Sequence, residues 1–279
     1  MLKRIITGLV AMAVLIPALV FSGTIVFPIA IAVVGVISLY EIFKCIGIIK
    51  KTLFIIPAYI AALIFPFLLR YMNSSTDVAI IAAICALMYL VYTFAHIIWS
   101  HGKFAFNDGL TAYMLVLYIL FALNSIIYIR DYDNIGKYIY LLIFIGAWIT
   151  DIFAYFTGMF LGKHKLIEDV SPKKTIEGSI GGIFFCALSF VAFGIIVDYF
   201  FNMNENIIFL AISGIIISVI SQIGDLIMSV VKRHYGIKDF GKIFPGHGGI
   251  LDRFDSIFAV TLGITCVCMF ITLTNIQII

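Results

Sequence analysis

The sequence carries little charge for its length. Of its 279 residues, 18 are Lys or Arg and 15 are Asp or Glu, which is 12% of the chain, whereas a soluble globular domain carries about 25%. Hydrophobic residues make up 63%, and the mean hydropathy is +1.16. This composition excludes a soluble globular domain, a disordered chain and a coiled coil.

Cysteine is too sparse for a disulfide scaffold, and its placement excludes one as well. The five cysteines all lie in or beside apolar runs, where a thiol behaves as a small hydrophobe. Cys266 and Cys268 have no second cysteine pair and no neighbouring His, so they give only a weak indication of a metal site.

The motifs of common soluble enzymes are missing. There is no G-x-x-x-x-G-K-S/T and no G-x-G-x-x-G, which excludes the usual nucleotide-binding motifs. G-x-S-x-G and H-E-x-x-H are absent too. The short alternating strands of a membrane β-barrel are also lacking, as are internal repeats.

What the sequence does contain is a series of long apolar runs. Runs of about 20 apolar residues are typical of transmembrane helices, so the sequence predicts an all-α, polytopic integral membrane protein. We expect a single membrane domain, with amino-terminal helices that lack motifs (1–136) and catalytic helices with cytoplasmic loops (137–279). The predicted spans are 5–22, 24–43, 53–71, 77–98, 109–129, 137–161, 179–201, 206–231 and 254–275.

The basic residues predict the orientation of these spans. With a cytoplasmic N-terminus, 15 of the 18 basic residues fall on the inner side, and only Arg70, Arg130 and Lys137 fall outside. Basic residues in short loops mark the cytoplasmic side, so we expect an N-in, C-out protein of the cell membrane. Two inner segments, 162–178 and 232–253, are basic and contain glycine, which suits a cytosolic substrate with several phosphates.

The eighth predicted span carries a polar face. Ser221, Asp225 and Ser229 are spaced by four residues and share one side of a helix. An ionisable group at membrane depth usually faces a cavity, a partner or a metal. Taken alone, Asp225 fits equally well a functional site and a simple pair with a basic residue of a neighbouring helix.

A second group of polar residues lies at 246–255. Asp252 and Asp255 are three positions apart near the start of the ninth span, and close carboxylates need a cation or an Arg between them. Capping of the helix explains one Asp well and two less well. Gly246, Gly248 and Gly249 allow backbone amides to approach an anion. A lone His247 is more typical of a loop histidine than of a ligand or an acid.

A third group lies at 151–178. Asp151 sits at membrane depth and is a functional candidate, whereas Ala154, Gly158 and Gly162 have the spacing of close helix packing. The loop that follows contains Ser-Pro-Lys-Lys-Thr-x-Glu-Gly at 171–178. Lysine pairs at a membrane surface often anchor lipid headgroups, but this order also offers donors for a phosphate and a Glu that can accept from a base or a ribose.

The stretch 229–255 resembles the signature of the phosphatidate cytidylyltransferase (CDP-diacylglycerol synthase) family. That signature reads S-x-apolar-K-R-x4-K-D-x-small-x2-apolar-P/G-x-H-G-G-apolar-x-D-R-apolar-D, and every fixed position is met. Residues 171–178 and the Ser-Gln-x-Gly-Asp-Leu of 221–226 are similar to the family too. The motifs cover about 148–256; before that, the resemblance rests on hydropathy and span number. Met228 stands where many bacterial members carry an acidic residue.

This resemblance implies a membrane enzyme that converts CTP and phosphatidate to CDP-diacylglycerol and pyrophosphate. It also implies Mg²⁺, with a second cation left open. The implied partners are CTP, phosphatidate and membrane lipid, without nucleic acid, and a homodimer is one open state of assembly. The active site is expected to face the cytoplasm.

The resemblance also implies roles for individual residues. The implied metal ligands are Asp225, Asp252 and Asp255, with Asp151 as a fourth ligand or a supporting carboxylate. The implied catalytic residues are Asp225, Asp252, Asp255, Lys232, Arg233 and His247. The implied substrate-binding residues are Ser171, Lys173, Lys174, Thr175, Glu177, Ser221, Ser229, Lys238, Gly248, Gly249 and Arg253.

Two other classes of protein fit parts of the pattern. A secondary transporter would use the intramembrane Asp151 and Asp225 to bind a coupling ion, but the carboxylates cluster with basic loops on one side and inverted repeats are absent. A related cytidylyl- or phosphotransferase acting on an isoprenoid lipid is the other alternative. It would reject diacyl phosphatidate, whereas a transporter would catalyse uptake into vesicles without CTP.

Overall fold

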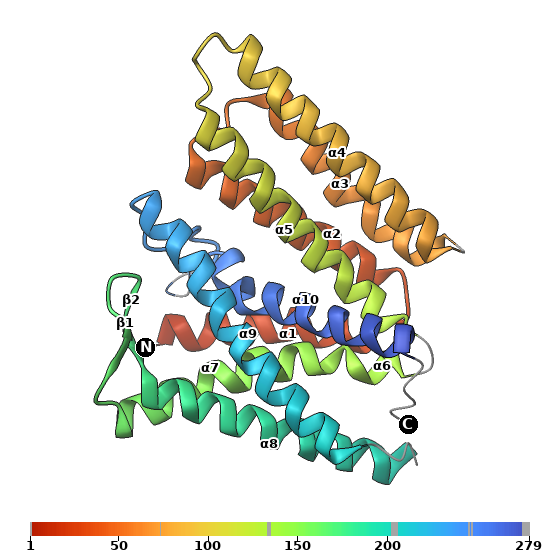
Figure 1. Ribbon diagram of the computed structural model, residues 1–279, viewed down its shortest axis with the longest axis vertical. Helices are drawn as coiled ribbons and strands as arrows, with labels where there is room; N and C mark the ends of the chain where they lie inside the picture. Colours follow the sequence, from red (N-terminus) through yellow and green to blue (C-terminus); the bar gives the residue numbers. More distant parts are fainter. Residues whose placement is uncertain are drawn as a thin grey trace. The chain divides into compact units, whose positions relative to one another are not determined.

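A computed structural model of the chain describes residues 2–72, 74–132, 135–201, 206–244, 246 and 248–274. Long helices dominate it (Figure 1), so the predicted all-α fold is confirmed. The elements in chain order are α1 (Leu2–Val20), α2 (Val26–Ile46), α3 (Thr52–Tyr71), α4 (Ser75–Trp99), α5 (Phe106–Arg130), α6 (Gly136–Ile139), α7 (Leu141–Leu161), β1 (Lys165–Ile167), β2 (Ser171–Thr175), α8 (Ile176–Phe201), α9 (Ile207–His234) and α10 (Leu251–Thr274).

The helices coincide with the predicted spans. Within the described part of the chain, eight helices are long and apolar enough to cross a membrane, and α6 and α7 together make one of them, Gly136–Leu161. In α1 the apolar stretch is shorter, Ala11–Val20. A helix satisfies its backbone polar groups internally, which hydrocarbon demands. The number of nine spans and the N-in orientation stay predictions.

The chain divides into two compact units. The first consists of Met1–Tyr128 and Tyr235–Arg253, and the second of Ile129–His234 and Phe254–Ile279. The loop after α9 therefore groups with the amino-terminal helices and not with the helices that precede it. This loop carries most of the signature stretch 229–255.

In the first unit, α2 packs against two other helices through a small residue. A Cβ atom at Gly35 would lie 3.5 Å from side-chain atoms of both Ala62 of α3 and Leu123 of α5. The other buried residues of α2 include Leu39, Ile42 and Phe43, each with an exposed fraction of 0%. An apolar helix buried on this scale gives the unit a rigid centre.

In the second unit, α7 and α8 approach each other closely. A Cβ atom at Gly178 would lie 2.6 Å from the carbonyl oxygen of Ala154 and 3.1 Å from the Cα of Gly158. The predicted close packing by small residues is therefore confirmed for Ala154 and Gly158. On α9, Gly214 allows a similar approach to α8, since a Cβ atom at this position would lie 2.7 Å from the Cα of Ala187.

A short hairpin connects α7 to α8, as Figure 1 shows. Its strands β1 and β2 are antiparallel, with Lys165 opposite Thr175 and Ile167 opposite Ser171. The sequence predicts only a loop here. The hairpin fixes the direction in which successive side chains of β2 point, because strand residues alternate between two faces.

Candidate active site

Two aspartates from neighbouring helices of the second unit meet each other. Asp225 lies on α9 and Asp255 on α10, and their carboxyl groups interact electrostatically. The preceding residue on α9 explains this proximity: a Cβ at Gly224 would lie 2.4 Å from the Cβ of Ala259 and 3.1 Å from the carbonyl oxygen of Asp255. Only glycine at this position allows the two helices to come this close.

Two lysines supply positive charge to this carboxylate pair. Lys174, on β2, forms an ion pair with Asp225. Lys232, near the end of α9, is only 8% exposed and interacts electrostatically with both Asp225 and Asp255. Adjacent carboxylates repel each other, so the lysines stabilise the charged form of the pair. Asp225 therefore does pair with a basic residue, as one alternative from the sequence states. That residue comes from the hairpin, however, and not from a neighbouring helix.

Asp151 of α7 lies at the edge of the same group. Its Oδ2 accepts a hydrogen bond of 3.2 Å from the hydroxyl of Ser256, the residue after Asp255. The charge of Asp151 also acts on Asp255. The Asp151 side chain is exposed, whereas Asp255 is 9% exposed. Hence the structure brings together the predicted residues Asp151, Asp225, Asp255, Lys174 and Lys232, called the carboxylate–lysine cluster below.

The polar face predicted for α9 is present. Ser221 and Ser229, which flank Asp225 by one helical turn on each side, are 0% and 8% exposed. The hydroxyl of Ser221 has no hydrogen-bond partner among the residues that the structure describes. A buried polar atom without a partner is costly in a folded protein, so Ser221 is available to donate to a bound group.

The hairpin presents its lysines differently. Lys174 points to Asp225, whereas the side chain of Lys173, its neighbour on β2, is exposed. Ser171 is half-buried. Arg233 follows Lys232 and donates from Nε to the carbonyl oxygen of Val170, at 3.4 Å. The end of α9 is therefore tied to the hairpin that carries Lys174.

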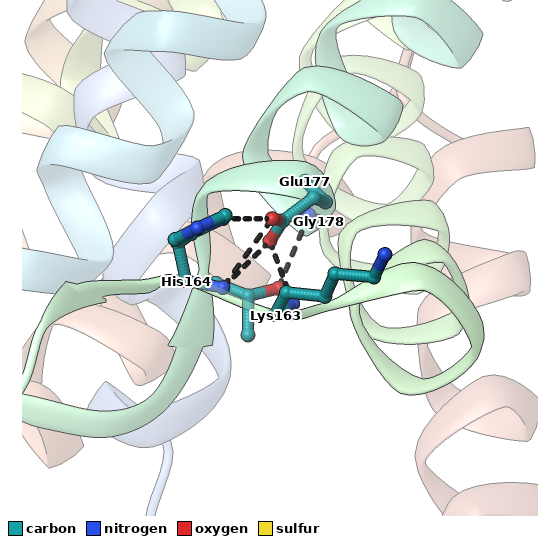
Figure 2. Close-up of polar contacts among 5 residues, drawn as sticks. Lys163, His164, Glu177 and Gly178 are labelled. Atoms are coloured by element: carbon teal, nitrogen blue, oxygen red, sulfur yellow. Dashed lines mark hydrogen bonds and ion pairs between the residues drawn. The ribbon is translucent and has the colours of Figure 1, made fainter.

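Glu177 forms hydrogen bonds to Lys163 and His164, just after α7 ends (Figure 2). Its carboxylate accepts from the backbone N–H groups of Lys163 (3.1 Å) and His164 (3.2 Å) and contacts His164 Nδ1 at 2.7 Å. The hydroxyl of Thr175 accepts from the N–H of Gly178 at 3.2 Å and so caps α8. The structure thus gives both residues a structural task; their predicted role with the nucleotide stays a prediction.

The glycine-rich segment belongs to the first unit. Gly248 has a φ of +85°, and a Cβ there would lie 2.7 Å from Oδ2 of Asp252. That same oxygen accepts from the N–H groups of Gly249 (2.9 Å) and Phe240 (2.8 Å). Asp252 therefore organises the loop, as the capping interpretation expects for one of the two aspartates, and its predicted metal role stays a prediction.

The remaining predicted residues lie in or beside this segment. Lys238 and Arg253 are exposed, and Gly249 is buried. His247 lies outside the described residues. At the start of the segment, the Tyr235 hydroxyl donates to Oδ1 of Asp108 at 3.3 Å. Burial raises the pKa of Tyr235 above its usual value, so the phenol keeps its proton and remains a donor at neutral pH.

One important residue was not predicted from the sequence. Glu41 of α2 is 1% exposed, and its two carboxylate oxygens accept from the N–H groups of Ile250 (3.1 Å) and Leu251 (2.8 Å). The signal is present in the sequence, because Glu41 is the sole acidic residue before Asp77 and lies in an apolar run. An ionisable residue in such a run indicates a functional or strongly paired position.

The donor set suits a magnesium ion that is held partly by substrate. Within the described residues, no group of three or more His, Cys, Asp and Glu side chains forms a ready metal site. Magnesium is commonly bound by one or two carboxylates, several waters and the phosphates of a nucleotide. The adjacent carboxylates of Asp225 and Asp255 fit that pattern.

The helical membrane fold, the carboxylate pair and the basic residues around it define a membrane-embedded enzyme for phosphate chemistry. The chain belongs to the cytidylyltransferase family, because the sequence model of that family matches residues 2–271. It is accordingly a CTP-using nucleotidyltransferase.

Relatives called phosphatidate cytidylyltransferase are similar over nearly the whole chain. The Staphylococcus haemolyticus protein is 34% identical over 259 residues, which cover 92% of this chain and 95% of the relative. The Staphylococcus aureus (strain COL) protein is 35% identical over the same shares of both chains. A Staphylococcus epidermidis relative is 34% identical with equal coverage.

Proposed function

We propose that this protein transfers the cytidylyl group of CTP to phosphatidate, forming CDP-diacylglycerol and pyrophosphate for phospholipid synthesis. The observation that carries the proposal is the carboxylate–lysine cluster, because its residues lie within the motif-bearing stretch 148–256 and suit a reaction between two polyanions. The names of the relatives, matched over 92% of the chain, support phosphatidate as the acceptor.

The reaction needs positioning more than it needs a base. The phosphate monoester of phosphatidate has a second pKa of about 6, so it is already an oxyanion at neutral pH. One of its oxygens forms a bond to the α-phosphorus of CTP while the bond from that phosphorus to the bridging oxygen of the β-phosphate breaks. The electron pair leaves with pyrophosphate. In such transfers, alignment and charge stabilisation supply most of the rate.

Residues of the cluster divide this work by charge. Asp225 and Asp255 would hold Mg²⁺, with Asp252 and Asp151 as the further predicted carboxylates; the ion, when bound, would neutralise charge on the phosphates. Lys174 and Lys232 would bind phosphate oxygens as point charges. When the nucleotide binds, the ammonium of Lys174 can exchange its contact with Asp225 for one with a phosphate.

The cytoplasmic orientation of the site is part of the proposal. The two segments that carry the basic signature residues, 162–178 and 232–253, lie on the side rich in Lys and Arg in the predicted topology. CTP is made in the cytosol, so a site on that side reaches its substrate directly. The membrane is proposed to be the cell membrane.

The test uses purified protein in detergent with Mg²⁺ and CTP labelled at the α-phosphorus. Phosphatidate and an isoprenoid monophosphate are offered in separate reactions. We expect label in the lipid phase with phosphatidate and little with the isoprenoid phosphate. Label found only in the isoprenoid lipid would show that this lipid, and not phosphatidate, is the acceptor. Label in neither lipid would refute the proposed activity.

A further inference from the structure

Glu41 fills the space against the signature loop and leaves no room for side chains there. A Cβ atom at Gly249 would lie 2.2 Å from Oε1 of Glu41, and a Cβ at Gly241 would lie 2.1 Å from the same atom. Neither glycine has a positive φ in the structure. The second glycine of the His-Gly-Gly motif is therefore required by the bulk of Glu41, whereas Gly248 is required by its backbone conformation.

Glu41 and Asp252 together satisfy three consecutive backbone donors. Asp252 accepts from Gly249, and Glu41 accepts from Ile250 and Leu251, where α10 begins. The first N–H groups of a helix have no partner within the helix, and a carboxylate there also interacts favourably with the helix dipole. Both oxygens of Glu41 accept these bonds and the residue is only 1% exposed, so it acts on the loop.

The start of the loop has its own attachment to the same unit. Tyr235 donates to Asp108 of α5, and the loop ends on Glu41 of α2. The amino-terminal helices carry no signature motif, yet they hold both ends of the segment that carries Lys238, Gly248, Asp252 and Arg253. Their arrangement indicates a task for this half of the chain.

We propose that Glu41 is a positioning residue for cytidylyl transfer, which sets the backbone of residues 249–251 and thereby the nucleotide-binding loop. The expected effect on the kinetics with CTP rests on the proposed function. The expected effect on the loop's structure does not. It assigns to the amino-terminal helices the role of a platform for the loop.

The first test is a double-mutant cycle between Glu41→Ala and Gly249→Ala. In the presence of Glu41, Gly249→Ala creates a steric overlap, and we expect kcat/KM for CTP to fall by about tenfold or more. In the Glu41→Ala background the same change should cost less than about threefold, because residues in contact are coupled. Equal losses in both backgrounds would show that Glu41 does not dictate the glycine, and would overturn the proposal.

The second test uses Glu41→Gln, because a glutamine side chain has the same shape as glutamate and fits the same space. The amide places a donor against backbone N–H groups, so we expect the KM for CTP to rise by about tenfold while the KM for phosphatidate stays within about twofold. A loss of folded protein would lower kcat and leave both KM values unchanged. Wild-type KM values for Glu41→Gln would contradict the proposal.

Ser38→Ala is the matched control. Ser38 lies one turn before Glu41 on α2, is 0% exposed, and its hydroxyl has no hydrogen-bond partner within the described residues. Its replacement disturbs the same helix one turn away from Glu41 and removes no hydrogen bond that the structure describes. We expect wild-type kinetics; a defect equal to that of Glu41→Gln would assign the effect to packing of α2 and overturn the proposal.

A measurement without CTP separates this inference from the proposed function. Lys238 and Lys242 are exposed trypsin sites in the loop. We expect Glu41→Gln to speed cleavage at these sites by about tenfold, because local opening becomes easier, with Ser38→Ala at the wild-type rate. If wild-type protein makes no CDP-diacylglycerol, the proposed function fails while the cleavage result still decides the role of Glu41. Unchanged cleavage in Glu41→Gln would refute it.

Discussion

Lys173 and Lys174 are neighbours in sequence but have different environments, and this difference yields a sharp prediction. Lys174 pairs with Asp225 of the carboxylate–lysine cluster, whereas the side chain of Lys173 is exposed. We expect Lys174→Ala to impair turnover strongly and Lys173→Ala to impair it much less. The pair is well matched, since both changes remove one lysine from the same five-residue strand.

The magnitude follows from the loss of the contact that the Lys174 ammonium would make with a phosphate oxygen. A hydrogen bond to a charged group contributes about 1.5–3 kcal/mol, and about 1.4 kcal/mol corresponds to a factor of ten. The side chain of Lys174 is only 25% exposed, so solvent screens its charge incompletely. Lys174→Ala should thus lower kcat/KM by roughly 10- to 150-fold, while Lys173→Ala should stay within roughly threefold, as expected for an exposed charge.

The assay is CDP-diacylglycerol formation in detergent with saturating phosphatidate, with CTP varied. With saturating lipid, a weaker attraction to lipid headgroups no longer limits the rate. The transmembrane helices also hold the protein in the micelle without help from a surface lysine. If Lys174→Ala retains wild-type rates and CTP dependence, the lysine is a surface anchor and the cluster is assigned too broadly. Equal losses in both variants would refute the distinction between the two lysines.

Three further predictions concern the cation, the aspartates and the topology. Asp252→Asn and Asp255→Asn should each abolish turnover while the protein stays folded by gel filtration, because the carboxamide keeps the shape but loses the charge that attracts Mg²⁺; near-normal turnover in both would remove them from the metal site. Chelation with EDTA should abolish activity and added Mg²⁺ should restore it, whereas activity in excess EDTA would show that no divalent cation is needed. Single cysteines placed in 162–178 and 232–253, in a background without the five native cysteines, should be labelled only from the cytoplasmic side; labelling of either segment from outside would break the predicted topology.

The helices were predictable because their signal is strong and local. Each long apolar run became a helix, since a lipid environment allows few other backbone structures. The polar face of Ser221, Asp225 and Ser229 was predictable for a similar reason, as a helix repeats every 3.6 residues. The spacing alone left open what Asp225 would meet, and the structure answers with Asp255 and Lys174.

The features that were not predictable depend on residues distant in sequence. The hairpin consists of strands of only three and five residues, β1 and β2, whose pairing leaves little trace in hydropathy. Asp252 and Asp255 are equivalent by spacing, yet Asp252 accepts from Phe240 and Gly249 while Asp255 interacts with Asp225. The helical repeat of 3.6 residues does not indicate which partner each aspartate has.

Glu41 illustrates the limit most clearly. Its partners Ile250 and Leu251 lie more than 200 residues later in the chain. Sequence indicates that such a carboxylate needs a partner, but not which one. Likewise, the grouping of Tyr235–Arg253 with the amino-terminal helices arises from tertiary contacts, and nothing in the composition of the loop indicates it.

The central claim is that a phosphate oxygen of the lipid attacks the α-phosphorus of CTP and expels pyrophosphate. It is tested most directly by parallel reactions of the purified protein with phosphatidate, Mg²⁺ and CTP labelled at either the α- or the γ-phosphorus. Label from the α-position should enter the lipid phase, and label from the γ-position should stay in water as pyrophosphate, in equal amounts. Label from the γ-position in the lipid, or no transfer of the α-label, would contradict the claim.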